Sequence, residues 1–265
     1  MRPTELAILS AVPLEIESFS GSFPIRGELR IAGKRFTLHQ HHGLSLMIGT
    51  TGIGKTNAAA VTAAVLTRFG PIEVWLTGCS GAYEKSALDI GDVLVTREWI
   101  CGDEGVLEKG TRVPSGHIDI PVLTVNGVSL FDRFPIHAFA SGRFALESVT
   151  PGKYAIDSGN RLTPLQPDSV CGNFFNIAHG PSLTIGMVSG DPQTADERYR
   201  YSSALAENME GSAVAQTCLL FGAPFFECRG ISNIAGVRAK SEWKIAEAMK
   251  NCNSLIRHML EGAAR

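Results

Sequence analysis

The sequence predicts one α/β domain built on a mixed central sheet. Short β-prone apolar runs alternate with helix-like segments along the chain, which is the pattern of a sheet covered by helices. The 265 residues are within the range of a single α/β domain, and a hydrophobic fraction of 44% supplies a continuous core. Neither a linker nor an internal repeat divides the chain. We therefore expect residues 1–265 to form a single domain.

The N-terminal strands and helix are predicted from the spacing of apolar residues and from the glycines that separate the apolar runs. Strands are predicted over Glu5–Val12, Glu28–Ala32, Arg35–His41, Leu44–Gly49, Ile72–Thr77 and Asp92–Ile100. The second and third of these alternate around Gly33-Lys34, which predicts a hairpin. A helix is predicted over Asn57–Phe69, where apolar residues recur at helical spacing after a glycine-rich turn. The small residues from Gly78 to Gly81 predict a turn after the preceding strand.

The middle of the chain, from about Cys101 to Gly180, is rich in Pro, Gly and Ser and has only short apolar runs. It is expected to form loops and short strands, with at most one helix, over a binding face. Regular structure resumes beyond it. The predicted elements there are a strand over Ser182–Val188, helices over Asp196–Ser203 and Gly211–Phe221, a strand over Pro224–Ile231 and an amphipathic closing helix over Glu242–Glu261.

Composition excludes several function classes. The chain has 24 Lys and Arg against 26 Asp and Glu, so no basic excess indicates a nucleic acid or a membrane surface as partner. No apolar run approaches the ~18 residues that a membrane helix needs. The short N-terminal apolar stretch contains Glu5 and continues into the fold, unlike a signal peptide. The six cysteines have no metal-ligand or redox spacing, which favours reduced thiols and a cytoplasmic location. His39-Gln40-His41-His42 is interpreted as the end of a polar edge strand rather than a metal site.

One nucleotide-binding motif is present as a pattern. Residues Gly49 to Thr56 satisfy G-x-x-x-x-G-K-[ST], between a predicted strand and a predicted helix. A phosphate loop would place backbone amides and Lys55 around phosphates and Thr56 on magnesium. Such an enzyme also needs a metal-binding Asp at the end of another strand. The strands end instead in Thr77-Gly78-Cys79 and Ser232-Asn233, so the phosphate-loop interpretation is disfavoured.

Seven segments in series resemble the nucleoside phosphorylase and nucleosidase superfamily, in its order and at its spacing. They are Ala11–Glu15, Thr51–Lys55, Thr77–Ala82, Ile90–Val93, Ser189–Asp191, Asn208–Gly211 and Arg229–Asn233. The resemblance covers both ends of the chain and leaves about 101–180 unmatched. It implies a three-layer α/β/α fold around a twisted mixed sheet that curls toward a barrel. It also implies a homo-oligomer that acts on a small nucleoside without a metal or cofactor.

Within this superfamily, Ile231 to Arg238 followed by Trp243-Lys244-Ile245 is most similar to the futalosine hydrolases. That resemblance implies an N-ribosyl hydrolase that releases hypoxanthine from futalosine in a menaquinone pathway. The alternatives left open are nucleosidases that release adenine from methylthioadenosine, adenosylhomocysteine or aminodeoxyfutalosine. A nucleoside phosphorylase and a phosphate-loop NTPase are less favoured.

The chemistry of purine release requires a base that activates the nucleophile, a group on the ribose and a group at the departing purine. Glu15 is the candidate base. Related phosphorylases are expected to have a phosphate-binding arginine at this position, and a second where Leu76 stands here. A carboxylate and an apolar side chain in place of two cations favour hydrolysis over phosphorolysis. The alternative for Glu15 is a solvated loop carboxylate.

Glu210 is the candidate ribose ligand. By resemblance, its carboxylate accepts hydrogen bonds from both ribose hydroxyls, and its charge favours a cationic sugar. A plain helix-start carboxylate is compatible with the same position. Met209 would lie under the sugar as an apolar floor or belong to the core.

Asn233 is the candidate purine ligand. Relatives that release adenine are expected to have Asp here. An Asn amide can donate to the oxygen of a 6-oxopurine, while its carbonyl accepts from a protonated ring nitrogen. The Asn therefore favours hypoxanthine over adenine, with protonation of the leaving base supplied from elsewhere. An Asn in a local turn before Gly236 is the alternative.

The remaining site candidates are carried by the resemblance. The substrate-binding set is Ile53, Cys79, Ser80, Gly81, Gly190, Asp191, Gln193, Met209, Arg229 and Ser232. Arg229 is expected to order Glu15 or Asn233, or else to pair with a surface acid. Cys79 is expected to be needed for its small size rather than as a nucleophile. Phe174 and Phe175 could stack on the base or belong to the core. Candidates for the acidic tail of futalosine are Arg143, Arg198 and Arg238.

Overall fold

The computed structural model describes residues 4–70, 72–109, 111–139, 142, 149–157, 161–166 and 174–262. The strands of the large sheet are β1 (Leu6–Ser10), β2 (Ile25–Ile31), β3 (Lys34–His41), β4 (Leu44–Thr50), β5 (Glu73–Ala82), β6 (Val93–Cys101), β11 (Arg133–Pro135), β12 (Gly152–Ile156), β13 (Leu162–Pro164), β14 (Phe174–Thr184), β15 (Ala206–Asn208) and β16 (Phe225–Ile234). Two small hairpins are β7 (Val106–Glu108) with β8 (Thr111–Val113) and β9 (Leu123–Val125) with β10 (Val128–Leu130). The helices are α1 (Pro13–Ser20), α2 (Lys55–Phe69), α3 (Pro192–Ser202), α4 (Gly211–Phe221) and α5 (Ile245–Gly262), with short 3₁₀ turns at Glu84–Ser86, Ser115–Ile118, Ile136–Ala138 and Lys240–Glu242.

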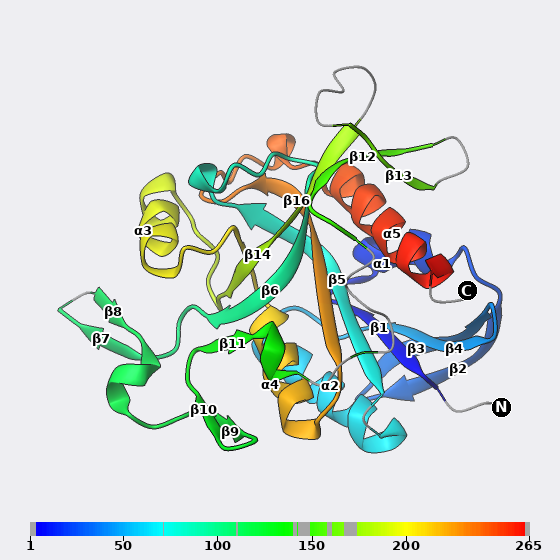
Figure 1. Cartoon of the computed structure of the whole chain (residues 1–265), viewed down its shortest axis with the longest axis horizontal. Helices are drawn as coiled ribbons and strands as arrows, with labels where there is room; N and C mark the ends of the chain where they lie inside the picture. The colour runs from blue at the N-terminus through cyan, green and yellow to red at the C-terminus, as the bar shows by residue number, and fades with distance from the viewer. Residues whose placement is uncertain are drawn as a thin grey trace.

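The fold has three layers, as the family resemblance implies (Figure 1). The main strand order is β13-β12-β14-β6-β16-β5-β1-β4-β3-β2, with parallel and antiparallel neighbours. Successive residues of β1 point to opposite faces, since Leu6 and Ile8 pack with α1 and α5 while Ala7 and Leu9 pack with α2 and α4. A sheet covered on both faces explains why its central strands are continuously apolar.

The central strands close on themselves around β15. This short strand pairs in parallel with β14 and antiparallel with β5, while β14, β6, β16 and β5 are consecutive neighbours in the sheet. The five strands therefore form a closed ring, consistent with a sheet that curls toward a barrel. The closure brings the segment after β15, which contains Glu210, beside the C-terminal part of β5.

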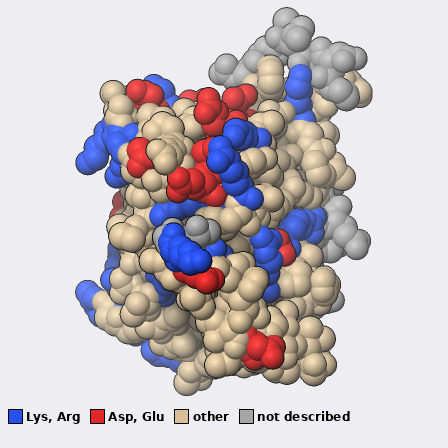
Figure 2. Space-filling view, turned by 90° about the vertical axis from the view of Figure 1, so that its left-hand side faces the viewer, with Lys and Arg blue, Asp and Glu red and all other residues tan. Residues whose placement is uncertain are grey.

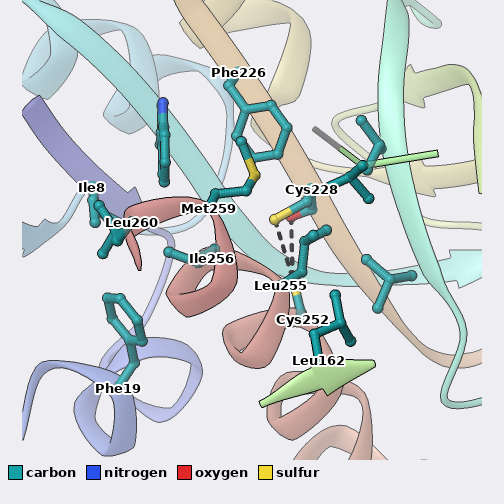
Figure 3. Close-up of a cluster of buried hydrophobic side chains, with 14 of the residues drawn as sticks. Ile8, Phe19, Leu162, Phe226, Cys228, Cys252, Leu255, Ile256, Met259 and Leu260 are labelled. Carbon is teal, nitrogen blue, oxygen red and sulfur yellow. Dashed lines mark hydrogen bonds between the residues drawn. The ribbon is translucent and has the colours of Figure 1, made fainter. Parts of the chain in front are cut away.

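Helix α5 covers one face of the sheet with a continuous apolar stripe (Figure 3). Leu255, Ile256 and Leu260 pack with Ile8 of β1 and Phe19 of α1. The same helix places Cys252 beside Cys228 of β16, with 3.4 Å between the two Sγ atoms. The cysteines in the described part of the chain are free thiols.

Four local expectations were wrong. Residues Gly78 to Gly81 continue β5 instead of turning, and the two glycines make room for neighbouring functional groups rather than for a bend. Strand β14 begins at Phe174 and ends at Thr184, before the predicted strand end at Val188. His39 and His41 lie at the end of β3, with His42 in the turn that follows, and β3 lies between β2 and β4 and is not an edge strand.

The fourth error concerns the N-terminal region. Helix α1 follows β1 directly, with Pro13 in its first turn, and is not among the elements that the sequence predicts. The hairpin turn is formed by Ala32 and Gly33, both with positive φ, one residue earlier than expected. An eight-residue helix is too short for its periodicity to stand out in the sequence.

Charges of both signs are mixed on the face that carries α3 (Figure 2). Ion pairs there join Lys85 and Arg200 to Asp196. This face therefore has no single-sign patch of the kind that nucleic acid requires. Within the described ranges, no helix combines the length and the apolar character needed to cross a bilayer.

The packing of β16 on α5 predicts a stability effect at Gly230. A methyl group there would lie 2.3 Å from the carbonyl oxygen of Ala248, a backbone atom of α5 that cannot rotate away. We expect Gly230→Ala to lower the free energy of unfolding by about 1–3 kcal/mol or more, as overpacking does. Gly262→Ala is the control, since a methyl group there meets nothing within 4 Å. Urea denaturation of both variants tests this, and equal stabilities would contradict it.

Candidate active site

The candidate site lies where β5, β16 and the start of α4 meet the first turn of α1. Glu15, Cys79, Glu210 and Arg229 come from four separate segments, yet hydrogen bonds or close approaches link them in one continuous cluster. Gly78 is the point of closest approach. A methyl group on it would lie 2.6 Å from Arg229 Nη1 and 2.8 Å from Glu15 Oε1. Glycine is therefore needed here for space.

Glu15 is buried in the first turn of α1 and is not a solvated loop residue. Its Oε2 accepts hydrogen bonds from the backbone N–H groups of Ala11 (3.0 Å) and Val12 (3.1 Å). Its Oε1 accepts from the backbone N–H of Cys79 at 2.9 Å. Asn253 of α5 donates to the Glu15 carbonyl at 3.3 Å. These contacts fix the carboxylate with Oε1 directed toward β5.

Arg229 is the buried cation of the cluster, and only 1% of it is exposed. Its Nε donates to Glu227 Oε1 at 2.6 Å, and its Nη1 lies 3.4 Å from Glu210 Oε2. Burial disfavours the charged guanidinium, but the nearby carboxylates of Glu227, Glu210 and Glu15 outweigh that cost and raise the pKa of Arg229. Arg229 therefore pairs with buried acids and not with a surface acid.

Glu210 is the residue that precedes α4, as the sequence suggested, and it is almost fully buried. Its Oε1 accepts from the backbone N–H of Gly54 at 3.0 Å. Asn208 fixes the same turn, since its Oδ1 accepts from the N–H groups of Glu210 (3.1 Å) and Gly211 (2.8 Å). Burial raises the pKa of the Glu210 carboxyl, and the Arg229 charge opposes that rise.

The glycine-rich turn before α2 binds a carboxylate of the protein itself. Gly52 and Gly54 have φ of +96° and +91°, a conformation that glycine tolerates best, and the Gly54 amide points at Glu210. Lys55 donates to Asp103 (2.6 Å) and Glu104 (3.0 Å). The Gly54 amide and the Lys55 ammonium, which would bind phosphate in a phosphate loop, are therefore already bound to carboxylates of the protein. This agrees with the disfavoured status of the phosphate-loop interpretation. The Ile53 side chain between the two glycines is exposed.

Cys79 and Ser80 belong to β5, and Cys79 lies beside the Glu15 carboxylate. The Cys79 thiol donates to Glu15 Oε1 at 3.3 Å, and burial together with the Glu15 charge raises its pKa to about 12. The thiol is therefore protonated at neutral pH, as expected of a residue that is not a nucleophile. The Ser80 hydroxyl is buried and has no hydrogen-bond partner among the described residues.

Asn233 ends β16 beside Gly81, where a methyl group would lie 3.1 Å from Asn233 Nδ2. Its Oδ1 accepts from the Ser232 hydroxyl at 2.9 Å, and its Nδ2 donates to the Ile234 carbonyl at 3.0 Å. An amide oxygen has two lone pairs and an amide nitrogen two protons. One acceptor position and one donor position of Asn233 are thus left for a ligand.

The segment Ser189–Asp191 approaches β16 through its backbone. A methyl group on Gly236 would lie 2.6 Å from the Asp191 carbonyl oxygen. The Asp191 side chain caps α3 by accepting from the backbone N–H of Thr194 (2.8 Å), and Gln193 donates to Glu197 on the helix surface (3.0 Å). Gly190 is exposed. The segment therefore approaches the residues after β16 through its backbone, at the Asp191 carbonyl.

A buried carboxylate, Glu207 of β15, anchors this segment. It accepts from the backbone N–H of Ser189 at 2.8 Å and from the Tyr83 hydroxyl at 3.0 Å. Arg198 joins the same group, with 3.0 Å from its Nη1 to the Ser189 hydroxyl. Arg198 is therefore occupied and is a poor candidate for the substrate tail.

The remaining candidates for substrate binding differ in their burial and their contacts. Phe175 belongs to the core, whereas Phe174 is exposed and lies under the Lys153 ammonium. Arg238 stacks over Trp243. Arg143 lies outside the described residues. Met209 is half-buried beside Glu210.

Four residues that hold the site together are not predicted from the sequence: Glu227, Asn208, Glu207 and Trp99. Glu227 had a usable signal, because it interrupts the apolar run Phe225–Cys228 and stands two residues before Arg229. A charge inside a buried strand needs a partner, and positions i and i+2 share one face. Within the described ranges, no cluster of three His, Cys, Asp or Glu is arranged to hold a metal.

Comparison with known proteins identifies the family of this chain. The model of the Phosphorylase superfamily matches residues 5–261. Futalosine hydrolase of Thermus thermophilus is 34% identical over 218 residues, which cover 81% of this chain and 82% of that protein. The 5′-methylthioadenosine/S-adenosylhomocysteine nucleosidase of Chromohalobacter salexigens is 29% identical over 234 residues, covering 88% and 85%.

Solved structures with the same fold include two Helicobacter pylori enzymes, each 18% identical and covering 98% of both chains. One is the 5′-methylthioadenosine/S-adenosylhomocysteine nucleosidase, with a TM-score of 0.72, and the other is futalosine hydrolase, with a TM-score of 0.71. The chain belongs to the phosphorylase superfamily. Within it, the protein is a nucleosidase, an enzyme that hydrolyses N-glycosidic bonds.

The charge cluster predicts how Glu210 titrates. Because burial dominates, the Glu210 carboxyl should titrate above the ordinary glutamate range, and Arg229→Gln should move the midpoint higher still by removing an opposing charge. Carbon-13 NMR titration of the glutamate carboxyl groups measures both midpoints. Arg200→Gln, on the exposed surface of α3, is the control and should leave the midpoint unchanged. A lower midpoint in Arg229→Gln would contradict the arrangement.

Proposed function

We propose that this nucleosidase cleaves futalosine to hypoxanthine and dehypoxanthine futalosine, a step of menaquinone biosynthesis. The observation that carries the proposal is Asn233 at the end of β16. Its free amide proton can donate to the oxygen of a 6-oxopurine, and its free lone pair can accept from a protonated ring nitrogen. The 34% identity to the Thermus thermophilus enzyme supports the same substrate.

The proposed reaction is the attack of water on the anomeric carbon. Glu15 takes a proton from the water, the new C–O bond forms, and the bond from carbon to purine nitrogen breaks with its electron pair on the purine. Solvent supplies the proton that the purine needs. Glu210 accepts hydrogen bonds from the ribose hydroxyls and stabilises the cationic sugar. Met209, Cys79 and the Ser189–Asp191 backbone are proposed to surround the nucleoside.

Hydrolysis rather than phosphorolysis follows from the charges near the nucleophile. Glu15 would repel phosphate, and Leu76, where a second cation could stand, is buried in the core. Further expectations are a cytoplasmic, metal-independent enzyme that self-associates. Assays in EDTA and light scattering after gel filtration measure the last two.

A second candidate is an adenine-releasing nucleosidase acting on methylthioadenosine, adenosylhomocysteine or aminodeoxyfutalosine. The Chromohalobacter salexigens relative favours it, since it aligns over 88% of the chain. Both candidate functions would use the same cluster of charged residues, and they differ in the purine that is released.

The substrate proposal is tested by comparing purine release. In phosphate-free buffer, we expect kcat/KM for futalosine to exceed that for methylthioadenosine by ~100-fold or more, because a buried hydrogen-bonding site rejects a mismatched group. Asn233→Asp should lower the ratio of kcat/KM for futalosine to kcat/KM for methylthioadenosine at least ~10-fold. The reason is that a protonated carboxyl can donate a hydrogen bond where the adenine ring accepts one. Inosine and adenosylhomocysteine complete the panel. Turnover of adenine nucleosides alone would reject futalosine in favour of the second candidate.

The proposed roles of Glu15 and Glu210 are tested by isosteric variants. Glu15→Gln and Glu210→Gln should each lower kcat at least ~100-fold, the loss expected for a general base or a charge partner of the transition state. Glu17→Gln is the matched control, since Glu17 is on the exposed face of the same helix as Glu15. Near-normal turnover in either site variant would remove that residue from the mechanism.

A further inference from the structure

Glu207 is a buried carboxylate at the Asn233 end of the candidate site, and the reaction outlined above does not use it. It belongs to β15, where it is paired with Gly81 of β5, and Gly81 is in turn paired with Asn233 of β16. Residues paired directly across neighbouring strands have their side chains on the same face of a sheet. Glu207 and Asn233 are therefore directed to one face, on either side of a glycine that has no side chain.

The hydrogen bonds of Glu207 hold a segment without regular structure. Residues 186–190 are described, and they belong to neither a helix nor a strand. Glu207 Oε1 accepts from the backbone N–H of Ser189 at 2.8 Å, and Oε2 accepts from the Ser189 hydroxyl at 2.6 Å. The Tyr83 hydroxyl donates to the same Oε2 at 3.0 Å. The carboxylate thus binds both polar hydrogens of Ser189.

Arg198 fixes the direction of the Ser189 hydroxyl. A guanidinium can only donate a hydrogen bond, and a carboxylate can only accept one. Arg198 Nη1 lies 3.0 Å from Ser189 Oγ, so this oxygen accepts from Arg198 while its single proton goes to Glu207. The Arg198 and Glu207 side chains are only 16% and 4% exposed, so solvent ions screen their attraction little. Ser189 is therefore held from two sides with one possible polarity.

A second carboxylate holds the other end of the same segment. Asp103 Oδ2 accepts from the backbone N–H of Gly186 at 2.6 Å. The Asp103 side chain is 36% exposed, so this anchor is less shielded from solvent than that of Glu207. Between the two anchors, Met187 is 79% exposed, so its packing contributes little to the placement of the segment. The arrangement of the segment therefore depends on carboxylates, above all on Glu207.

We propose that Glu207 is a positioning residue for the purine, because it anchors Ser189 and thereby keeps residues 189–191 in place before the ligand binds. The inference rests on the proposed place of the purine beside Asn233. Ser189 is fixed on the β15 side of Gly81, and Asn233 stands on its β16 side. A purine bound between them meets a backbone that is already ordered, so binding does not have to order the segment.

The proposal is tested with Glu207→Gln, which keeps the shape but replaces one acceptor oxygen by an amide and removes the charge opposite Arg198. We expect the KM of the nucleoside and the inhibition constant of the free purine to rise about 10-fold, as when about one molecule in ten has the segment in place. Because saturating substrate restores the arrangement, kcat should stay within about 3-fold of wild type. Glu197→Gln, an exposed position on α3, is the matched control and should change neither constant.

Two hydroxyl variants separate anchoring of the segment from general loosening of a buried cluster. Ser189→Ala and Tyr83→Phe each remove one hydroxyl donor to Glu207 Oε2, but only Ser189 belongs to the segment. We expect Ser189→Ala to raise both constants about 3-fold or more, the effect of one lost hydrogen bond, and Tyr83→Phe to leave them within about 2-fold. This pair decides the matter if Glu207→Gln does not fold.

Hypoxanthine and adenine are both measured as inhibitors, and the purine that binds the wild type more tightly is used for the comparison. A preference for adenine would reject the futalosine assignment without affecting the test of Glu207. A raised KM at near-normal kcat in Glu207→Gln and Ser189→Ala, but not in Tyr83→Phe, supports the proposal. Unchanged constants in a folded Glu207→Gln, a loss of kcat alone, or equal effects of Ser189→Ala and Tyr83→Phe would each overturn it.

Discussion

The site depends on one buried ion cluster, that of Arg229 with Glu227 and Glu210. A guanidinium that is 1% exposed is stable only if carboxylates surround it, and those carboxylates are stable only if it is present. The cluster therefore specifies how β16, the end of β15 and the start of α4 meet. Glu210, the acid proposed to bind the sugar, is positioned by the same requirement.

Close backbone approach is the second constraint on the site. Gly78 leaves space for Glu15 and Arg229, Gly81 for Asn233, and Gly211 for Glu227. In each case a missing side chain lets a functional side chain of another segment reach the strand or helix. Closure of β14, β6, β16, β5 and β15 into a ring then brings these segments together from distant parts of the sequence. The abundance of glycine near the site thus has a steric cause.

The α/β class and most core elements could be predicted, because apolar periodicity reports burial directly, whereas the three-layer architecture was implied by the family resemblance. Helix α1 and the extension of β5 through Gly78–Gly81 could not, since an eight-residue helix and a run of small residues have no clear periodic signal. Within the candidate site, motif resemblance pointed to Glu15, Glu210 and Asn233. The partners that hold them depend on long-range pairing, as between Trp99 and Glu227, which are 128 positions apart.

The most direct test of the account is a crystal structure of the enzyme with hypoxanthine bound. The account predicts the purine against the end of β16, with its 6-oxygen about 3 Å from Asn233 Nδ2. It also predicts that the Arg229 cluster keeps its arrangement, with Glu210 directed toward the place of the ribose. Hypoxanthine bound away from Asn233, or bound with its 6-oxygen turned from that amide, would contradict the assignment.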